Sequence, residues 1–374
     1  MRTLAIFGPE PICASHRTGH FMLEGRRLAC ALKQVDAPVF DAAAPENAGK
    51  VLVRKRGFSF NYRDRALMLS LAVNGPPGSF YGFGSDFVAE VLSVGPAVTG
   101  LAAGDRVIGN AAYPESGAAG VAAGVPANSA SRELQVFPAV KLMKIPDSMN
   151  DEVAAGFTIG AQTSYSMVRK IGIAPGDPVL VTAARSNTSL FAIAALARRG
   201  AIVHASTTSR RDDAALRAAG VAGIIHLDRA AAPDFAAHPV CQGVLRSHGG
   251  YAAVVDPFFD LYLVPALAVM AFGARYTTCG MHDQHSHLVG AGAAPAIQAS
   301  GANPLVTVMM KNLSVIGNCI GLSEDLALAV ADHAAGRFPV IVDSVFRDSD
   351  GAAAFLERSY NAPDRFGKTV FLYD

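Results

Sequence analysis

The spacing of apolar residues along the chain changes near Pro146. Before it, apolar and polar positions alternate over short stretches such as SDFVAEVLSVG (85–95), and Gly, Pro and Asp separate the stretches. This alternation predicts half-buried β-strands joined by turns. VLVRKRGFSF (51–60), the stretch after Gly104-Asp105, and MRTLAIFG at the start are predicted strands of the same kind. The N-terminal part is therefore expected to be rich in β-structure.

After Pro146, predicted strands and helices alternate. MNDEVAAGFTIGAQTSYSMVRKIG (149–172) predicts a helix that Asn150 or Asp151 caps. Apolar strands and Ala- and Leu-rich helices then follow one another from PVLVTAA (178–184) to ARYTTCG (274–280). The chain closes with a predicted helix over 323–338 and with strands near VIVDSVF and GKTVFLYD. Alternation of this kind predicts a parallel sheet with crossover helices.

Composition narrows the classes of function. The 374 residues are 51% hydrophobic and 17% charged, which suits two domains with sizeable cores. The net charge of +1 gives no electrostatic footprint for nucleic acid or a membrane surface. The N-terminus lacks the basic start and long apolar core of a signal peptide, and no stretch is long and apolar enough for a transmembrane helix. We therefore expect a cytoplasmic protein that acts on a small molecule.

The five cysteines agree with this interpretation. Cys13, Cys30, Cys241, Cys279 and Cys319 are scattered and odd in number, and none forms a Cys-x-x-Cys pair. The spacing therefore supports neither a disulfide framework nor a cysteine zinc site. Reduced thiols, as in the cytoplasm, are the simple explanation.

A series of segments in a fixed order carries a family resemblance. Each is weak alone, but together they make the chain resemble the medium-chain dehydrogenases/reductases, on the quinone oxidoreductase and enoyl reductase side of that family, from about residue 45 to the end. The segments are GFSFNYRDRAL (57–67), FGSDFVAEVLSVG (83–95), GDRVIGN (104–110), TSYSMVRKIGIAPGDPVLV (163–181), VVDP (254–257) with GARYTTCG (273–280), KNLSVIGN (311–318) and RFGKTVFLYD (365–374).

The resemblance implies an α/β architecture of two domains. A GroES-like β-barrel catalytic domain is expected over 1–149 and 337–374. A Rossmann domain with a doubly wound parallel sheet is expected over 150–336. The active site would lie in the cleft between them, where a nicotinamide faces the substrate. KNLSVIGNCIG (311–321) resembles the edge strand through which relatives dimerise, so we also expect a homodimer.

The zinc ligands of some relatives are missing. Those relatives use an early Cys, a Gly-His-Glu segment and a structural lobe with four Cys. Here the first position falls in FSFNYRD, the second reads Gly84-Ser85-Asp86, and the lobe is absent. Thiolate and imidazole donors in tetrahedral array are what such a site requires. We therefore expect a zinc-independent enzyme without a metal.

The turn that should hold the cofactor pyrophosphate has no glycine. It reads Ala183-Ala184-Arg185-Ser186-Asn187-Thr188-Ser189, where relatives have several glycines in a turn of the same length. Hydroxyls, Arg185 and the helix N-terminus could still bind the pyrophosphate. Alternatively the pocket has decayed and the domain is a scaffold. Equal length and polar replacements favour binding by Ala184, Arg185, Ser186, Asn187 and Thr188, and Ser186 or Asn187 could also cap the helix.

The end of the second cofactor strand indicates the type of nucleotide. Ser206-Thr207-Thr208-Ser209-Arg210-Arg211 contains no acidic residue to accept from a ribose 2′-hydroxyl. Hydroxyls with arginines suit a 2′-phosphate. We therefore predict NADP(H), bound through Ser206, Thr207, Arg210 and Arg211. The alternative is a solvated helix start that happens to carry two arginines.

The candidate catalytic residues are Asn61, Tyr62 and His282. By resemblance, Asn61 and Thr163 lie near the nicotinamide, and a tyrosine is the acid in some relatives. Cys279 is a further candidate cofactor-binding residue. Tyr62 could equally pack in the barrel, and Thr163 could pack beside the cleft. His282, His285 and His287 in MHDQHSHLVG could supply a proton or contact an anion, or form an exposed loop. His204 and His226 are expected to be structural.

The predicted function is zinc-independent, NADP(H)-dependent reduction of an activated C=C, C=O or C=N bond in a small-molecule intermediate. The alternative is a protein of this fold that has lost redox function, either a non-redox enzyme or a scaffold.

Overall fold

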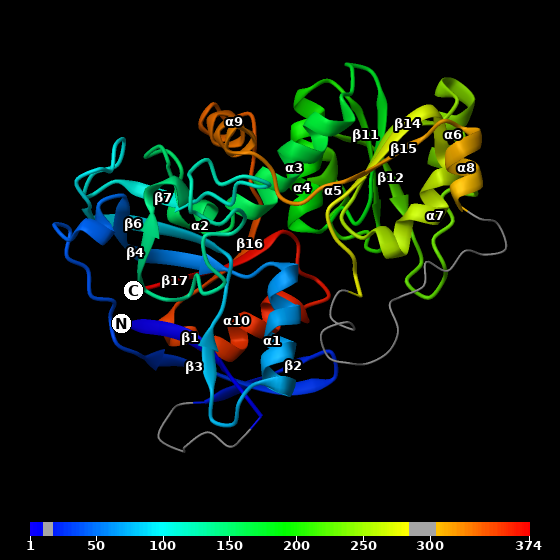
Figure 1. Cartoon of the computed structure of the whole chain (residues 1–374). Helices are drawn as coiled ribbons and strands as arrows, with labels where there is room; N and C mark the ends of the chain where they lie inside the picture. Colours follow the sequence, from blue (N-terminus) through cyan, green and yellow to red (C-terminus); the bar gives the residue numbers. More distant parts are fainter. Residues whose placement is uncertain (10–17, 284–303) are drawn as a thin grey trace.

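A six-stranded parallel sheet forms one half of the molecule. The computed structural model describes residues 1–9, 18–283 and 304–374 (Figure 1). The strand order is β12-β11-β10-β13-β14-β15, the doubly wound order. It reverses between β10 and β13, so a ligand crevice is expected at the carboxyl ends of these two strands. The strands are β10 (Pro178–Val181), β11 (Ile202–Thr207), β12 (Val221–His226), β13 (Tyr251–Asp256), β14 (Met270–Thr278) and β15 (Ser314–Gly317).

Helices cover both faces of this sheet because its strands are apolar on both sides. In β10, Val179 and Val181 pack in one core while Leu180 packs in another, as side chains that alternate across a strand must. None of the described helices has the length and apolar character needed to cross a bilayer. The helices of this half are α3 (Thr158–Ile171), α4 (Asn187–Arg198), α5 (Asp213–Ala218), α6 (Pro239–His248), α7 (Phe259–Val269), α8 (Pro304–Met310) and α9 (Ser323–Ala334).

The other half is built on two β-sheets. β4 (Lys50–Ser59) is the centre of the larger sheet and pairs with β6, β8 and β17. The smaller sheet has the order β2-β3-β1-β5. The other elements of this β-rich half, in chain order, are β1 (Arg2–Phe7), β2 (Gly19–Leu23), β3 (Arg26–Gln34), α1 (Tyr62–Asn74), β5 (Phe80–Gly82), β6 (Asp86–Val94), β7 (Arg106–Gly109), β8 (Leu134–Pro138), β9 (Leu142–Lys144), α2 (Asp151–Ala154), β16 (Val342–Phe346), α10 (Ala352–Tyr360) and β17 (Lys368–Leu372). Three 3₁₀ turns lie at Pro45–Asn47, Ala139–Lys141 and Asp348–Asp350.

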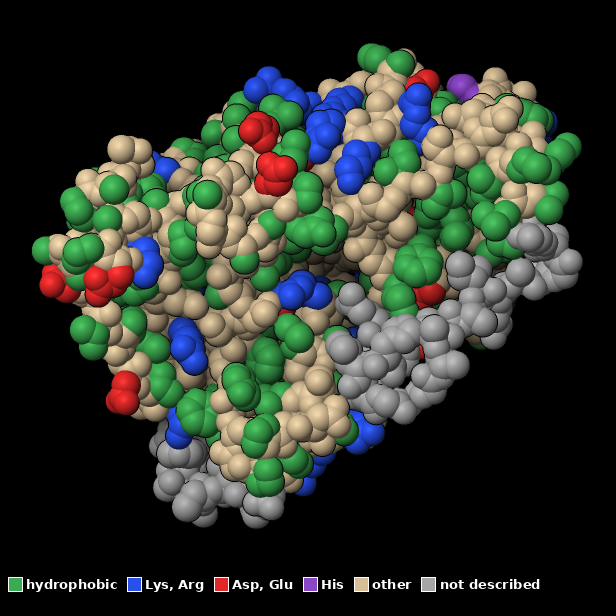
Figure 2. All heavy atoms as spheres, in the orientation of Figure 1, with side chains coloured by type: hydrophobic (Ala, Val, Ile, Leu, Met, Phe, Trp, Pro, Cys, Tyr) green, Lys and Arg blue, Asp and Glu red, His purple; other side chains and the backbone are tan. Residues whose placement is uncertain are grey.

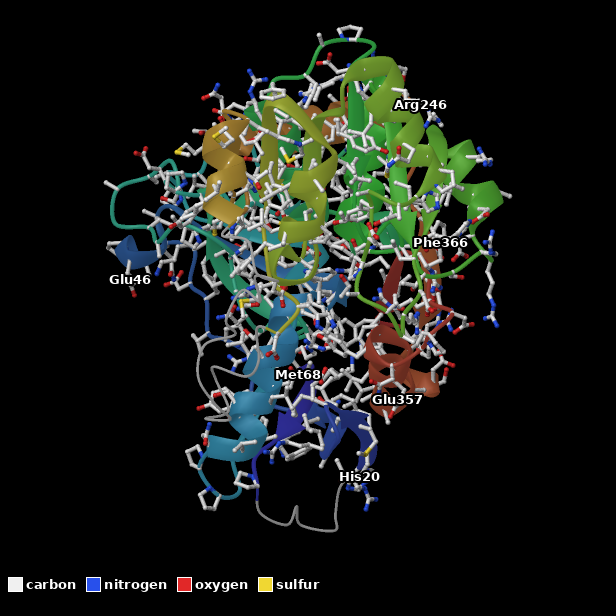
Figure 3. The ribbon with its side chains drawn as sticks, turned by 90° about the vertical axis from the view of Figure 1, so that its right-hand side faces the viewer. His20, Glu46, Met68, Arg246, Glu357 and Phe366 are labelled. Carbon is white, nitrogen blue, oxygen red and sulfur yellow. The ribbon has the colours of Figure 1, made fainter. Side chains whose placement is uncertain are left out.

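The C-terminal segment returns to this β-rich half. β16 and β17 are parallel neighbours in the larger sheet, and α10 packs on β2 and β17. In the side view of Figure 3, Phe366 lies between Glu357 of α10 and the strands of the parallel sheet. Residues 359–368 therefore reach the boundary between the two halves. The fold class predicted from the sequence is confirmed; α10 is an element that the pattern leaves unpredicted.

The single helix predicted over 149–172 is wrong, because two helices occupy this stretch. α2 ends at Ala154 and α3 begins at Thr158. At the break, an added Cβ on Gly156 would lie 2.6 Å from Cγ of Lys368, so a lysine stem fills the space that a side chain would need. The Asn150 cap is confirmed, since its side chain accepts from the Val153 amide at 2.9 Å.

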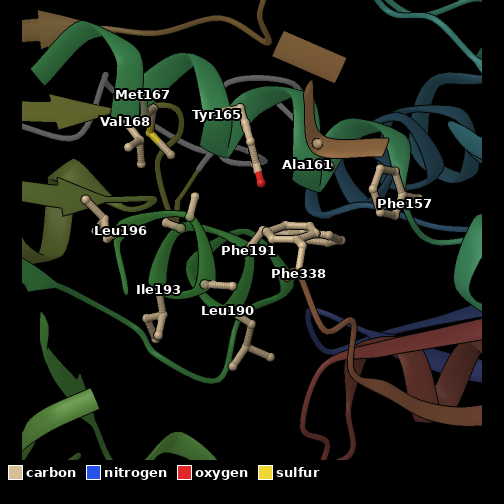
Figure 4. Close-up of a cluster of buried hydrophobic side chains, with 14 of the residues drawn as sticks. Phe157, Ala161, Tyr165, Met167, Val168, Leu190, Phe191, Ile193, Leu196 and Phe338 are labelled. Atoms are coloured by element: carbon tan, nitrogen blue, oxygen red, sulfur yellow. The ribbon is translucent and has the colours of Figure 1, made fainter. Parts of the chain in front are cut away.

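α3 and α4 pack closely around a cluster of aromatic rings. Phe191 stacks on Phe338 at 4.9 Å between ring centroids and meets the edge of Phe157 at 5.5 Å (Figure 4). The helices come so near that an added Cβ on Gly160 would lie 2.7 Å from both Asn187 Nδ2 and the Phe191 ring. Because Asn187 begins α4, this contact positions the turn in front of that helix.

Gly160→Ala should therefore destabilise the protein by about 1–3 kcal/mol through overpacking. Gly243→Ala is the matched control: Gly243 lies in α6 with nothing within 4 Å of an added Cβ. That substitution should be neutral or stabilise by up to about 1 kcal/mol. Urea unfolding of both variants measures the difference, and equal stabilities would contradict the close approach of α3 and α4.

Candidate active site

A cleft of about 940 Å³ lies between the two halves. Figure 2 shows the surface hollowed at this boundary. The parallel-sheet half contributes the turn 183–188, the ends of β11, β12 and β14, and residues 257–262. The β-rich half contributes Phe60–Arg63, Arg65 and residues of the C-terminal segment 359–368. The cleft therefore opens at the carboxyl ends of β10 and β13, where the strand order reverses.

The turn after β10 folds without glycine because Ala183 takes the left-handed conformation. Its φ is +48°, a region that L-residues other than Gly enter at a cost of about 1–2 kcal/mol. The Ala184 amide donates to the Ser206 carbonyl at 2.8 Å, and the Ser186 amide donates to the Ala183 carbonyl at 2.9 Å. These bonds hold the turn in place.

The turn presents unused backbone donors to the cleft. Within the described chain, the amides of Arg185, Asn187 and Thr188 make no hydrogen bond, and all three residues line the cleft. Ser186 caps α4, since its side chain accepts from the Ser189 amide at 3.1 Å. Free amides at a helix N-terminus, with the positive end of the helix dipole, suit a phosphate. The donors present thus fit a dinucleotide pyrophosphate.

Asp256 supports this turn through hydrogen bonds. Its carboxylate, at the end of β13, accepts from Thr182 Oγ1 at 2.5 Å and from the Phe258 amide at 2.8 Å. The Tyr276 hydroxyl also donates to it. Burial raises the pKa of Asp256 to about 6, and the three donors offset part of this shift. The carboxylate therefore joins β10, β13 and β14 beside the cleft.

The Arg185 side chain does not fit its predicted role as a phosphate ligand. Its guanidinium lies 2.7 Å from Asp212 and donates to the carbonyls of Pro363 and Arg365 at 2.8 and 2.7 Å. These contacts tie the turn to the C-terminal segment. The backbone of Arg185 remains a candidate phosphate donor, but its side chain is used to join the two halves.

Only some of the predicted 2′-phosphate residues lie in the cleft. Thr207 lines it, whereas Ser206, Arg210 and Arg211 do not, and both arginines are exposed. Arg229 lies there instead, three residues after β12, and its Nε donates to Thr208 Oγ1 at 3.0 Å. Sequence reasoning missed Arg229. The signal was available, because the carboxyl ends of neighbouring parallel strands meet at one edge of a sheet.

Basic side chains dominate the lining of the cleft. Asp228 is the one acidic residue among the described residues that line it. The basic residues are six: Arg63, Arg65, Arg185, Arg229, Arg365 and Lys368. Four have a carboxylate partner, whereas Arg229 and Arg365 form no ion pair with any described residue. An excess of positive charge in a cleft attracts anions. This balance favours an anionic ligand.

The Asn61 side chain is held in a buried polar cluster at the floor of the cleft. Its Oδ1 accepts from Lys368 Nζ at 2.6 Å, and its Nδ2 donates to Ser85 Oγ at 3.0 Å and Asp86 Oδ2 at 2.8 Å. Its backbone amide donates to Asp64, which is fully buried. With its amide group used in this way, Asn61 is better described as a positioning residue than as a catalytic one.

Tyr62 lies at the boundary of the two halves, half-buried beside the cleft. Its hydroxyl donates to the His282 carbonyl at 2.7 Å and accepts from Arg65, whose guanidinium lies 4.1 Å from the centre of the Tyr62 ring. Arg65 also pairs with Glu24. Burial raises the pKa of Tyr62, and the positive charge of Arg65 opposes that rise. The hydroxyl is thus protonated at neutral pH and has a cation beside it.

The other predicted residues divide between the cleft and the interior. Thr163, Cys279 and His282 line the cleft, and burial lowers the pKa of His282. His285 and His287 lie outside the described residues. His204 bonds to Tyr251 at 2.8 Å and His226 to Asp213 at 3.1 Å, contacts that agree with structural roles.

The positions that bind zinc in some relatives hold a different donor set. Ser85 and Asp86 are hydrogen-bonded within the Asn61 cluster, and the fully buried Asp64 accepts from Ser85 at 2.6 Å. No group of three His, Cys, Asp or Glu residues suited to a metal occurs in the described part of the chain. The donor set therefore does not fit a tetrahedral zinc site.

Parts of the chain are similar in sequence to known proteins. Residues 47–147 match the family model of the alcohol dehydrogenase GroES-like domain. Polyketide synthase GfsB of Streptomyces halstedii is 30% identical over 244 residues, which are 65% of this chain and 4% of that protein. Acryloyl-coenzyme A reductase of Metallosphaera sedula is 29% identical over 175 residues, 43% of this chain and 52% of that protein. The chain thus spans only part of these relatives.

Comparison with solved structures covers the whole fold. An NAD-dependent alcohol dehydrogenase superposes with a TM-score of 0.74 at 24% identity, covering 100% of this chain and 99% of that one. The 2-octenoyl-CoA carboxylase reductase CinF, in complex with NADP and 2-octenoyl-CoA, gives 0.70 at 20% identity, covering 91% and 82%. The fold combines a GroES-like and a Rossmann domain, as in these neighbours. These comparisons confirm the predicted resemblance to the medium-chain dehydrogenases/reductases.

Proposed function

We propose that this chain is a zinc-independent, NADP(H)-dependent reductase that acts on an activated C=C bond of an enoyl-type small molecule. The observation that supports it most is the shared cleft, which is lined both by Tyr62 and by the three residues of the turn whose amides are free, Arg185, Asn187 and Thr188. The relatives named acryloyl-coenzyme A reductase and CinF favour an enoyl thioester over the C=O and C=N substrates that the sequence left open.

The turn and the unpaired arginines support binding of NADP(H). The amides of Arg185, Asn187 and Thr188 would hold the pyrophosphate, while Arg229 with Thr208 would take the 2′-phosphate. Thr163 and Cys279 line the cleft and would lie at the nicotinamide end. When bound, the reduced cofactor supplies the hydride for the reduction.

Tyr62 is the candidate proton donor. Reduction of a C=C bond needs a proton on the carbon that does not receive the hydride. The Tyr62 hydroxyl carries such a proton, and Arg65 would stabilise the phenolate that remains. The bond to the His282 carbonyl orients the hydroxyl before substrate binds.

Tyr62→Phe should lower kcat for NADPH-dependent reduction of crotonyl-CoA by about 100-fold or more, because it removes the donated proton. The Kd for NADPH should change less than about threefold. Tyr113→Phe, at an exposed tyrosine outside the cleft, is the matched control and should retain full activity. Undiminished kcat in Tyr62→Phe would show that Tyr62 only packs between the halves.

Arg229→Ala should raise the Kd for NADPH about tenfold or more, because it removes a charge-assisted bond worth about 1.5–3 kcal/mol. The Kd for NADH should not change. Arg210→Ala compares the arginine that the sequence favoured, and its effect on NADPH should stay below about threefold. The chain has no Trp, so emission of the bound nucleotide is the suitable signal. A larger effect from Arg210 would restore the sequence-based assignment.

The alternative of a scaffold without redox function has a distinct result. If neither NADPH nor NADH binds at millimolar concentration, the redox proposal is wrong and the cleft serves another purpose.

We also propose a homodimer formed through β15. In the described chain no strand pairs with the outer edge of β15, where Val315 is half exposed, and Phe272, Leu305 and Met309 expose apolar surface nearby. Val315→Lys should convert a dimer into a monomer in sedimentation velocity, because a charge at an edge strand opposes pairing. A wild-type chain that sediments as a monomer would contradict the proposal.

A further inference from the structure

Lys368 is a buried lysine in the lining of the cleft. It begins β17, and its side chain is only 4% exposed. The stem passes Gly156, where an added Cβ would lie 2.6 Å from Cγ of Lys368. The fold thus leaves out a side chain at the break between α2 and α3 and fills the space with this lysine. A lysine so enclosed is rare unless it is paired or functional.

The Lys368 ammonium has more donors than partners. Nζ lies 2.6 Å from Asn61 Oδ1 and, at a longer 3.4 Å, from Asp86 Oδ2. Asp86 is shared, because it also accepts from Asn61 Nδ2 and from the Ile159 amide. A lysine has three N–H groups, so one remains unused by the described residues. Since the residue lines the cleft, a ligand oxygen is the partner that could take this donor.

The proposed reduction places a transient negative charge on the carbonyl oxygen of the substrate, where a hydrogen-bond donor is useful. In the proposed reaction, the hydride pair adds to the β-carbon of the enoyl group. The π electrons of the C=C bond then form a new double bond between the α-carbon and the carbonyl carbon, and the π electrons of the carbonyl move to its oxygen. A proton then adds to the α-carbon, and the C=O double bond forms again. Between these events, the oxygen carries a negative charge that a fixed cation in a site shielded from water stabilises strongly.

We propose that Lys368 is a catalytic residue that donates a hydrogen bond to this substrate oxygen and keeps its own proton throughout. The inference deepens the proposed function and rests on it. It separates two roles: Tyr62 gives up a proton, whereas Lys368 contributes a fixed positive charge. Asn61, which fixes Nζ, is then the residue that positions Lys368.

Several neighbours set the charge state of Lys368. Asp86 on β6 and Asp64 on α1 raise the pKa of its ammonium, while Arg365 in the segment before β17 lowers it. Burial is the largest cause, and the net result is a lowered pKa. The ammonium is therefore lost on the alkaline side, below the usual lysine value of about 10.4. The pKa of Tyr62 is raised, so its titration does not coincide with this loss.

Lys368→Met should lower kcat for crotonyl-CoA reduction by about 100- to 1,000-fold, the usual size for loss of an oxyanion donor. The Kd for NADPH, measured by nucleotide emission, should stay within about threefold. Lys55→Met is the matched control: Lys55 is equally buried in β4 and does not line the cleft, and its Nζ lies 3.8 Å from the centre of the Phe87 ring. It reports what loss of a buried lysine outside the cleft does to folding, so its kcat per folded protein should be unchanged.

The pH profile and chemical rescue separate catalysis from structure. Wild-type kcat/KM should fall as pH rises through the Lys368 pKa, and this alkaline limb should be absent in Lys368→Met. In Lys368→Ala, added ethylammonium should restore part of kcat in a saturable manner. Parallel loss of NADPH affinity without rescue would instead assign Lys368 a structural role and overturn the inference.

The outcomes distinguish this inference from the function on which it rests. If wild type reduces crotonyl-CoA and Lys368→Met does so equally well, the role of Lys368 is wrong and the reductase assignment remains. If wild type binds NADPH but does not reduce the enoyl thioester, the proposed function fails and the Lys368 assignment fails with it.

Discussion

The carboxylate of Asp86 is the contact on which the rest of the site depends. One oxygen accepts from the Ile159 amide near the start of α3, and the other accepts from Asn61 and Lys368. The β-rich half is thereby joined to the first long helix of the other half. A buried carboxylate is tolerated only where donors and a cation surround it. Removing Lys368 would leave this carboxylate without its cation, and removing a neutral donor would leave it with an unfilled hydrogen-bond position.

Gly156 and Gly160 complete this junction by the absence of a side chain. The first leaves room for the Lys368 stem, and the second lets α3 approach α4. Because Asn187 contacts both Gly156 and Gly160, the position of the turn 183–188 and that of the buried lysine are linked through a single short stretch of chain. The cleft is therefore shaped by backbone approach as much as by the residues that line it.

How much of this the sequence predicts differs between elements. The alternation of strands and helices predicts the parallel sheet, because strands such as β10 are apolar on both faces and repeat at regular intervals. The break after Ala154 is not predictable from periodicity, since the space at Gly156 is taken by a lysine more than 200 residues away. Arg185 looks like a phosphate ligand in the sequence, but only the fold shows that Asp212 and two carbonyls occupy it.

The effect of the missing glycines in the turn 183–189 also could not be predicted from the sequence alone. A glycine is needed for two separable reasons: positive φ and close approach of the backbone to phosphate. Ala183 meets the first at a modest cost in strain, and its methyl group is small enough that the free amides at 185, 187 and 188 still line the cleft. The turn thus keeps the free amides and the helix end that the proposed pyrophosphate site would use, although it lacks the glycine pattern.

The basic residues of the cleft are of two kinds. Four of the six basic side chains in the cleft form ion pairs with carboxylates. Such ion pairs join elements of the fold, as between Arg185 and Asp212 and between Lys368 and Asp86. Arg229 and Arg365, which form no ion pair with described residues, lie outside this framework. A cation held rigidly is already oriented when charge appears in a reaction, whereas an unpaired one gains most from binding an anion that is charged throughout. The two kinds of basic residue therefore suit the two different tasks proposed for them, stabilisation of a transient charge at Lys368 and retention of a phosphate at Arg229.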